Sequence, residues 1–292
     1  MIRKIAFLAC CVMLAYSSPA VYSQGGKYKY QETTNLVGLV NDAATLVSLK
    51  GDGAFKELMT NGSRWRTGDT YLFVSDLKGN IFVHENPSLV GKNLLDLKDR
   101  NGKPIIQWFI RKASAVGQSG WTHYVWAKPG QTGPSWKTTY VKLAKTSAGQ
   151  TYVVGSGLYD MKMEKEFAVE AVNDAMAQIG TMGKAAFPIL KNKASEFVYK
   201  DTYVFVLDPN CNMLVHPASP ELEGKNLRDM KDANGKFLFR EFVQVVQDHG
   251  SGWVDYVWPK PGTTKPVAKT TFVSKVVVKG ETFVVGTGIY IE

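Results

Sequence analysis

The sequence has few residues that could form disulfides or bind metals, since its 292 residues include three cysteines and four histidines. Two of the cysteines, Cys10 and Cys11, lie in an apolar run near the N-terminus, and Cys211 is the only one in the rest of the chain. One cysteine cannot form an intrachain disulfide. The sequence has no HExxH segment and no paired Cys/His spacing, so we predict no metal site and no cofactor.

Long apolar runs and clusters of basic residues are also missing. After the first residues, no segment has the uninterrupted apolar length of a membrane-spanning helix. The net charge of +9 is spread along the chain, without the basic clusters typical of nucleic-acid-binding patches. We therefore expect no membrane span in the mature chain and no nucleic-acid partner. The hydrophobic content of 45% is sufficient for two globular domains, each with its own core.

The N-terminal residues have the pattern of a secretory signal peptide. Arg3 and Lys4 precede an apolar run over Ile5–Ala15, and small residues follow it. We predict a signal peptide over residues 1–23, with cleavage near Ser23. The mature protein is then expected in the periplasm or outside the cell.

The rest of the chain consists of one unit written twice. The segment YVWAKPG at Tyr124–Gly130 returns as YVWPKPG at Tyr256–Gly262, and GKNL, SGW and VVG recur at nearly the same offset of 132 residues. The similarity covers almost the whole mature chain. We therefore predict a duplicated domain, with one copy over residues 28–160 and the other over residues 161–292.

Each copy begins with a helical pattern and continues with strands. Apolar residues of the first copy recur at spacings of three and four at Leu36, Leu39, Val40, Ala43, Leu46 and Val47. The hydrophobic period then changes to two in TYLFVSD, IFVHE, GWTHYVW, KTTYVKLA and TYVVGSGLY, with one short helix around PIIQWFIRKA. This order predicts an α+β fold in which a long N-terminal helix packs on a five-stranded antiparallel sheet.

Two repeated motifs look like ligand loops, but neither is expected to bind. GSGLY and GTGIY contain the Gly-x-Gly of phosphate loops, yet no helical pattern follows Gly288, so we expect these glycines to allow close backbone approach. KDRNGK and KDANGK resemble a calcium loop, but its first ligand position is Leu97 or Met230, and neither side chain binds a hard cation. A polar turn is the better interpretation. A turn is also the interpretation at Cys211, where the first copy has Gly79.

The Tyr/Trp pair of the repeated segment is the main candidate for a site. On a strand, Tyr124 and Trp126 point to the same face, which lines either the core or a pocket. Lys137 opens the next predicted strand, and a lysine beside an aromatic wall could bind a carboxylate through charge-assisted hydrogen bonds. No nucleophile elbow or repeated acid pair accompanies these residues, so we do not expect an enzyme.

The repeated segments together resemble the single Cache family, the extracellular PAS-like sensor domains of bacterial chemoreceptors and kinases. The resemblance rests on DTYLFVSDLKGN and DTYVFVLDPNCN, VHP, GKNL, the GW and YVW segments with KPG, KTTY and VVGTGIY. It implies a long helix on a PAS-like sheet, with the ligand held between the sheet and its covering loops. Members of this branch often bind short carboxylates such as acetate, propionate, pyruvate or lactate.

Matching positions imply one pocket in each copy. The implied pocket residues are His84, Tyr124, Trp126, Lys137 and Tyr140 in the first copy, and His216, Tyr256, Trp258, Lys269 and Phe272 in the second. Because Phe272 lacks the hydroxyl of Tyr140, this resemblance argues against equal ligand preference in the two copies.

The leading hypothesis is a periplasmic or secreted tandem Cache protein that binds a short carboxylate. The sequence includes neither the membrane helix nor the output module of a receptor, so we expect it to present its ligand to a membrane receptor or kinase. The alternative is a ligand-free interaction or assembly module of the cell envelope. That alternative predicts that Trp126 and Trp258 are fully buried, with no cavity beside the lysines.

Overall fold

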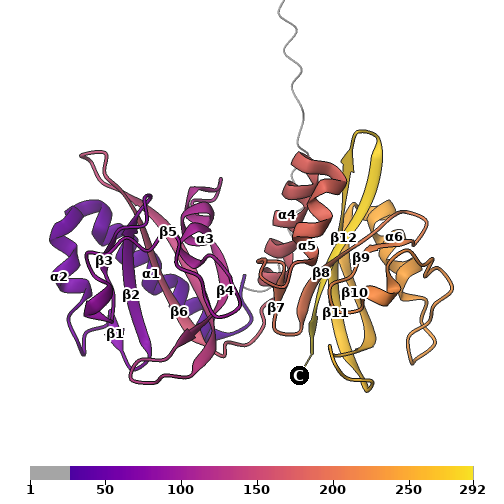
Figure 1. Cartoon of the computed structure of the whole chain (residues 1–292), viewed down its shortest axis with the longest axis horizontal. Helices are drawn as coiled ribbons and strands as arrows, with labels where there is room; N and C mark the ends of the chain where they lie inside the picture. The colour runs from indigo at the N-terminus through magenta and orange to yellow at the C-terminus, as the bar shows by residue number, and fades with distance from the viewer. Residues whose placement is uncertain (1–26, 292) are drawn as a thin grey trace, which may run out of the picture.

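The computed structural model describes residues 27–291, so the predicted signal peptide over residues 1–23 lies outside the described part. Two modules of the same architecture follow one another along the chain (Figure 1). Each begins with a long helix and continues into an antiparallel sheet, as the hydrophobic periods predict. No helix within the described range combines the length and apolar character needed to cross a bilayer.

The first module has a six-stranded sheet in the order β1-β2-β6-β5-β4, with β3 paired to β2. The sixth strand, absent from the prediction, is the two-residue β1. The elements are α1 (Gln31–Lys50), α2 (Phe55–Leu58), β1 (Arg66–Thr67), β2 (Thr70–Asp76), β3 (Ile81–Val83), α3 (Ile105–Ser114), β4 (Ser119–Ala127), β5 (Pro134–Lys145) and β6 (Thr151–Tyr159).

The second module repeats this arrangement, with a sheet in the order β10-β11-β12-β8-β7 and β9 paired to β8. Its elements are α4 (Lys165–Met182), α5 (Phe187–Lys191), β7 (Val198–Tyr199), β8 (Thr202–Leu207), β9 (Met213–Val215), α6 (Leu238–His249), β10 (Ser251–Pro259), β11 (Pro266–Val278) and β12 (Glu281–Tyr290).

Equivalent glycines end the two long helices. Gly51 after α1 has φ +55°, and Gly183 after α4 has φ +60°. Only glycine adopts this backbone conformation without steric cost, so the same stop signal is used in both modules.

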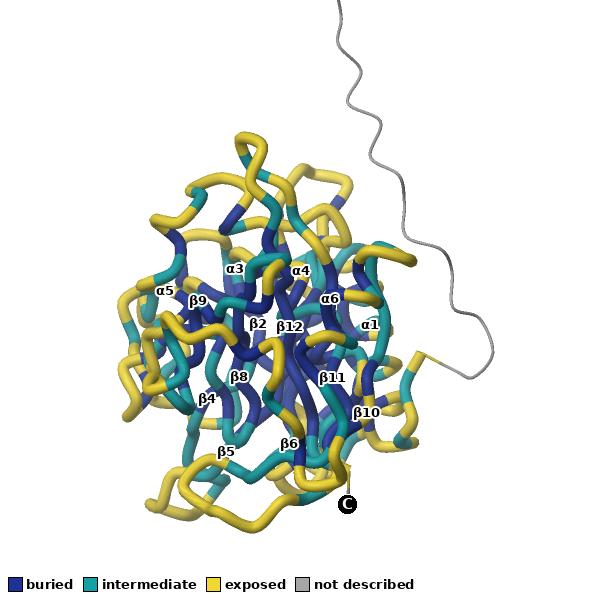
Figure 2. The backbone as a smooth tube through the Cα atoms, turned by 90° about the vertical axis from the view of Figure 1, so that its right-hand side faces the viewer, coloured by how far each residue is buried: buried dark blue, intermediate teal, exposed yellow. Residues whose placement is uncertain are grey.

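Each sheet is covered on both faces. In the first module, α1 packs on one face through Leu36, Val40 and Val47, and α3 packs on the other through Ile105 and Phe109. The strands in the middle of the molecule are accordingly buried, while the connecting loops are exposed (Figure 2). Side chains that alternate along β5 therefore enter two different cores.

The second module packs against the first through α4, which lies between the two sheets (Figure 1). Lys112 of α3 has 8% of its side chain exposed and donates to the carboxylates of Glu170 and Asp174 on α4. The Glu170 carboxylate also accepts the backbone N–H of Trp121 at 2.9 Å. An unpaired donor on the edge strand β4 is thus satisfied by the helix of the next module.

Further contacts join β4 and β5 to the start of the second sheet. Lys103 Nζ donates to the carbonyl oxygens of Ser195 and Val198 at 2.5 and 2.8 Å. The ring of His123 stacks on Tyr199, with centroids 4.2 Å apart. The equivalent of His123 in the second module is exposed Asp255, so the two copies differ at the position through which the first contacts the second.

Candidate ligand-binding sites

Each module buries a lysine among aromatic rings. In the first module, strand register aligns Tyr124, Lys137 and Tyr159 in one row across β4, β5 and β6. Lys137 is 1% exposed, and its Nζ lies 3.8 Å from the ring centre of Tyr71 and 4.7 Å from that of Tyr159. The ammonium group is therefore held by two cation–π contacts.

The second glycine of GSGLY makes room for this lysine. A Cβ atom on Gly157 would lie 3.0 Å from Cε of Lys137 and would also collide with Thr139. Gly155, the first glycine, is in similarly close contact with the ring of Phe73. The prediction that these glycines allow close approach in the last strand is confirmed, and the approaching groups include the backbone oxygen of Thr138 as well as side chains.

The positive charge of Lys137 has little compensation. Its one recorded hydrogen bond goes to the hydroxyl of Tyr159 at 3.5 Å, and it makes no ion pair within residues 27–291. Burial lowers the pKa of Lys137 from 10.5 to about 7, and the more distant charges of Glu85 and Asp69 oppose this only in part. A buried cation in this state is stabilised by any anion that can reach it.

His84 provides a neutral donor near the lysine. Its ring centroid lies 5.1 Å from that of Tyr71. Burial, together with the charges of Lys137 and Arg66, lowers the pKa of His84 to about 4. Its Nδ1 accepts the backbone N–H of Asn86 at 2.9 Å, so the proton of the neutral ring is on Nε2.

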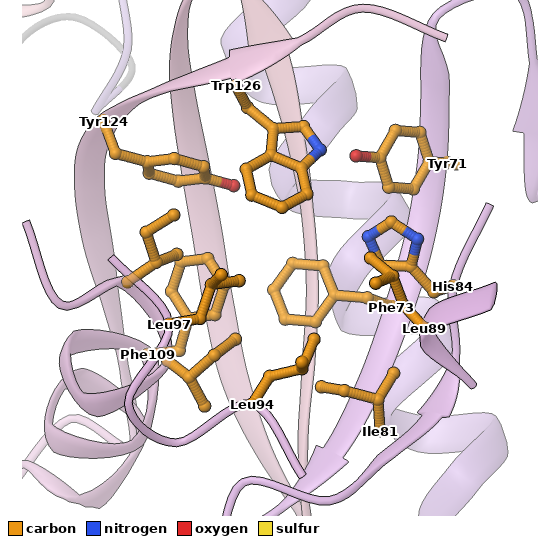
Figure 3. A pocket seen from close by; sticks show the side chains of 12 residues that line it. Tyr71, Phe73, Ile81, His84, Leu89, Leu94, Leu97, Phe109, Tyr124 and Trp126 are labelled. Carbon is orange, nitrogen blue, oxygen red and sulfur yellow. The ribbon is translucent and has the colours of Figure 1, made fainter. Parts of the chain in front are cut away.

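A cavity of about 30 Å³ lies against these residues (Figure 3). The polar tips of Tyr71 and Tyr124 point towards Trp126 on one side, and aliphatic and Phe side chains form the other. Lys137 is not among the residues that line the cavity, but its Nζ lies over the ring of Tyr71, which does line it. The lining residues are Tyr71, Phe73, Ile81, His84, Leu89, Leu94, Leu97, Ile105, Ile106, Phe109, Tyr124 and Trp126.

The structure does not place Tyr140 or Phe272 at the sites. Tyr140 belongs to the core under α1, where its ring is 4.9 Å from that of Trp121. Phe272 lies in the equivalent core of the second module, under α4. Tyr140 is three residues from Lys137 on one strand, so the two side chains point to opposite faces, and the pocket role expected for Tyr140 and Phe272 is wrong.

The second module has the same row of residues. Register aligns Tyr256, Lys269 and Tyr290 across β10, β11 and β12. Lys269 is 2% exposed and donates to the hydroxyls of Tyr203 and Tyr290 at 3.2 and 3.4 Å. Burial lowers the pKa of Lys269 to about 7. A Cβ on Gly288 would lie 2.6 Å from its Cε.

His216 repeats the arrangement of His84. Its Nδ1 accepts the backbone N–H of Ser219 at 2.8 Å, and burial lowers its pKa to about 4. Beside this site is a more open hollow of about 440 Å³, bounded by Tyr203, Trp258 and the loops over residues 218–222, 230–233 and 259–266. Lys269 and His216 are enclosed behind these walls.

Sequence reasoning missed the tyrosines that flank each lysine. They are Tyr71 and Tyr159 in the first module and Tyr203 and Tyr290 in the second. The repeat does contain these tyrosines at equivalent positions, because DTY stands at the start of β2 and β8 and a tyrosine ends both β6 and β12. Their importance depends on the pairing of β6 with both β2 and β5, which the sequence pattern did not supply.

The KDRNGK and KDANGK loops are polar turns, as predicted. Asp99 Oδ1 accepts the backbone N–H groups of Asn101 and Lys103 at 2.8 and 2.9 Å, and its Oδ2 accepts that of Val125 at 2.9 Å. Asp232 makes the equivalent three bonds. In the part of the chain that the structure describes, no group of three His, Cys, Asp or Glu residues could hold a metal ion.

Cys211 also lies in a turn, with φ +65° where the first copy has Gly79. It is 1% exposed, and burial raises the pKa of its thiol. These surroundings fit the predicted turn substitution and disfavour a reactive thiolate.

The described chain is a pair of PAS-like modules, each with an enclosed cationic site under an antiparallel sheet. The family model for the Cache domain matches residues 56–292, and the protein therefore belongs to the Cache family of sensory ligand-binding domains.

Known proteins match parts of the chain. It is 35% identical over 92 residues to the methyl-accepting chemotaxis protein McpP of Pseudomonas putida, which covers 32% of this chain and 16% of that protein. It is 36% identical over 93 residues to the sensor histidine kinase MctS of Rhizobium johnstonii, covering 32% and 20%. The chain thus spans a fifth or less of these relatives.

Two solved structures each match about one module. A periplasmic sensor domain of a chemotaxis protein is 37% identical, with a TM-score of 0.36, and the match covers 44% of this chain and 90% of that one. A Cache chemosensory domain described for carboxylic acid recognition is 28% identical, with a TM-score of 0.39, and the match covers 44% and 93%.

Proposed function

We propose that the protein is a periplasmic or secreted sensor that binds a carboxylate in each module. The observation that carries this proposal is the buried lysine of each copy, Lys137 or Lys269, which forms no ion pair within residues 27–291 and donates only to tyrosine hydroxyls. Removing an ammonium group from water is costly unless an opposite charge accompanies it. A carboxylate would supply that charge and would raise the pKa of the lysine back above neutrality.

In the first module, three kinds of donor surround the proposed carboxylate position. Lys137 supplies the charge, the hydroxyl of Tyr71 supplies a neutral hydrogen bond, and His84 supplies its Nε2–H. The side of the cavity formed by Leu94, Ile106 and Phe109 would receive an apolar tail. A cavity of about 30 Å³ suits an acid of only a few heavy atoms.

The proposed affinity is modest. A four-heavy-atom acid at the best ligand efficiency, about 1.5 kcal/mol per atom, gains about 6 kcal/mol, which corresponds to a Kd of tens of micromolar. Acetate, which has four heavy atoms, and the slightly larger propionate, pyruvate and lactate are the acids that we propose as candidates. Affinity in this range suits a sensor, because the site empties when the metabolite becomes scarce.

The proposed physiological role is to report such an acid to a membrane receptor or kinase. The similarity to a chemotaxis receptor and to a sensor kinase supports a sensory role. In this proposal, residues 1–23 are removed on export, and residues 28–160 and 161–292 form two Cache domains. Catalysis is not part of the proposed role.

A ligand-free assembly module requires that the protein's own aromatic side chains fill both sites. Trp126 and Trp258 are instead only partly buried, and each lines a hollow. This observation favours ligand binding over the alternative.

The test is thermal unfolding of the full chain with a panel of C2 to C4 carboxylates. At least one acid should raise the transition temperature, and Lys137→Met with Lys269→Met should remove the effect. Matched controls are Lys145→Met and Lys275→Met, since these lysines are exposed on the same two strands. A panel that leaves folded wild-type protein unchanged would contradict the proposal.

A further inference from the structure

The two sites share two walls but extend from them in different directions. Tyr71 and Trp126 line the cavity of the first module, and the equivalent Tyr203 and Trp258 line the hollow of the second. Beyond these walls, the first cavity continues inward to α3, whereas the second hollow continues outward among loops. The difference therefore concerns the part of a ligand that extends away from the lysine.

In the second module a larger side chain, Phe239, takes up space in the inward direction. Ile106, the second residue of α3, is replaced by Phe239 in α6, and Ile81 of β3 is replaced by Met213 in β9. The ring of Phe239 packs against Trp258, with centroids 6.0 Å apart. A phenyl group thus lies next to the tryptophan where the first module has a smaller aliphatic side chain and a cavity.

The outward direction is open in the second module and polar. Its covering loop, between His216 and Gly224, is one residue longer than the equivalent loop of the first module. The hollow of about 440 Å³ compares with about 30 Å³ in the first module. Hydroxyl and ammonium groups contribute to its lining, from Ser219, Lys231, Lys260 and Thr263, and two acidic residues, Glu221 and Asp232, line it as well.

We infer that the two modules recognise different acids. The first takes a short monocarboxylate whose apolar tail enters the cavity under α3. The second takes a longer acid that carries a second polar or acidic group, which lies in the outer hollow between Trp258 and the loop lysines. This inference rests on the proposed function and assigns a separate ligand class to each copy.

Tyr203 connects the outer hollow to the buried lysine. Its ring lines the hollow, and its hydroxyl accepts a hydrogen bond from Lys269 at 3.2 Å. A hydroxyl that accepts from an ammonium is a stronger donor to an incoming carboxylate. Lys231, whose Nζ lies 4.6 Å from the ring centre of Phe237, offers a cationic partner for a second acidic group at the far end of the ligand. Lys260 also lines the hollow, where its Nζ is 3.5 Å from the carboxylate of Asp201.

The experiment is calorimetric titration of the full chain with propionate and, separately, with tartrate. Each acid should bind with a stoichiometry of one. Lys137→Met should lower the affinity for propionate at least tenfold and change the affinity for tartrate less than twofold. Lys269→Met should lower the affinity for tartrate at least tenfold and change the affinity for propionate less than twofold. If either variant lost affinity for both acids to the same extent, the inference would be overturned.

Exchanging the two side chains beside the tryptophans gives a second test. Ile106→Phe should fill the first cavity and lower the affinity for propionate at least tenfold, without changing the affinity for tartrate. Phe239→Ile should open the second site inward and raise the propionate stoichiometry from one to two. Circular dichroism and the thermal transition check folding, and if Ile106→Phe does not fold, the Phe239→Ile stoichiometry decides.

The outcomes separate the two proposals. If neither acid binds folded wild-type protein, the proposed function and this inference both fail. If either acid fills both modules with similar affinity, the proposed function stands and only the assignment of separate ligands is overturned.

Discussion

The side chain of Lys137 crosses Gly157 of the neighbouring strand, with its Cε 3.0 Å from the position that a Cβ would occupy. Gly157→Ala should therefore displace the lysine. Overpacking of this kind destabilises a core by about 1–3 kcal/mol, and binding of a short acid to the first module should be lost. Chemical denaturation and calorimetry measure the two effects.

Gly133→Ala is the control for this change, because a Cβ at Gly133 meets nothing within 4 Å. It should leave both stability and binding unchanged. Wild-type affinity in folded Gly157→Ala would show that the position of the lysine does not matter for binding.

Binding should depend on pH through the lysines. The pKa of Lys137 and that of Lys269 are lowered by burial to about 7, and a carboxylate pairs only with the charged form. Affinity should fall as pH rises from 7 to 9, by up to about tenfold per unit, and binding should take up protons. Calorimetry in buffers with different ionisation enthalpies measures this uptake.

Stability without ligand should change in the opposite direction. An unfolded lysine titrates near 10.5 and these folded lysines near 7, so between these values the unfolded chain binds more protons. The free energy of unfolding should therefore increase with pH across this range, and Lys137→Met with Lys269→Met should reduce the slope. An unchanged slope in the double variant would contradict the assignment.

The contact between the modules should depend on Lys112. Lys112→Val installs the residue that the second module has at the equivalent position, Val245, and leaves Glu170 and Asp174 without their cation. Breaking a buried ion pair from one side costs about 3–5 kcal/mol. Calorimetric unfolding should then separate into two transitions. Arg64→Ala, which breaks the exposed pair with Asp42, should have little effect.

Asp99 should stabilise the fold without binding calcium. Asp99→Ala leaves three backbone N–H groups without their acceptor. A buried donor left unpaired costs about 1–3 kcal/mol, so denaturation should show a loss of at least this size. Neither added calcium nor a chelator should shift the thermal transition of the wild-type protein, and a calcium-dependent shift would revive the calcium-loop interpretation.

The element order and part of each site could be predicted from local patterns. Strand alternation correctly put Tyr124 and Trp126 on one face, and the repeat identified Lys137 with Lys269. The same alternation predicts that Lys137 and Tyr140, three residues apart on one strand, point to opposite faces of the sheet. The family resemblance had instead placed both of them in the pocket. Tyr159 ends the strand that follows that of Lys137, whereas Tyr71 comes from β2, which is distant in sequence, and only the pairing of β6 with both β2 and β5 brings Tyr71 to the lysine.

The surface through which the first module contacts the second is not repeated on the second module. Lys112 and His123 meet the second module, but the matching positions of that module are Val245 and exposed Asp255. A further tandem copy would find no cation there to receive an acidic helix such as α4. The two modules therefore differ at the positions through which the first contacts the second.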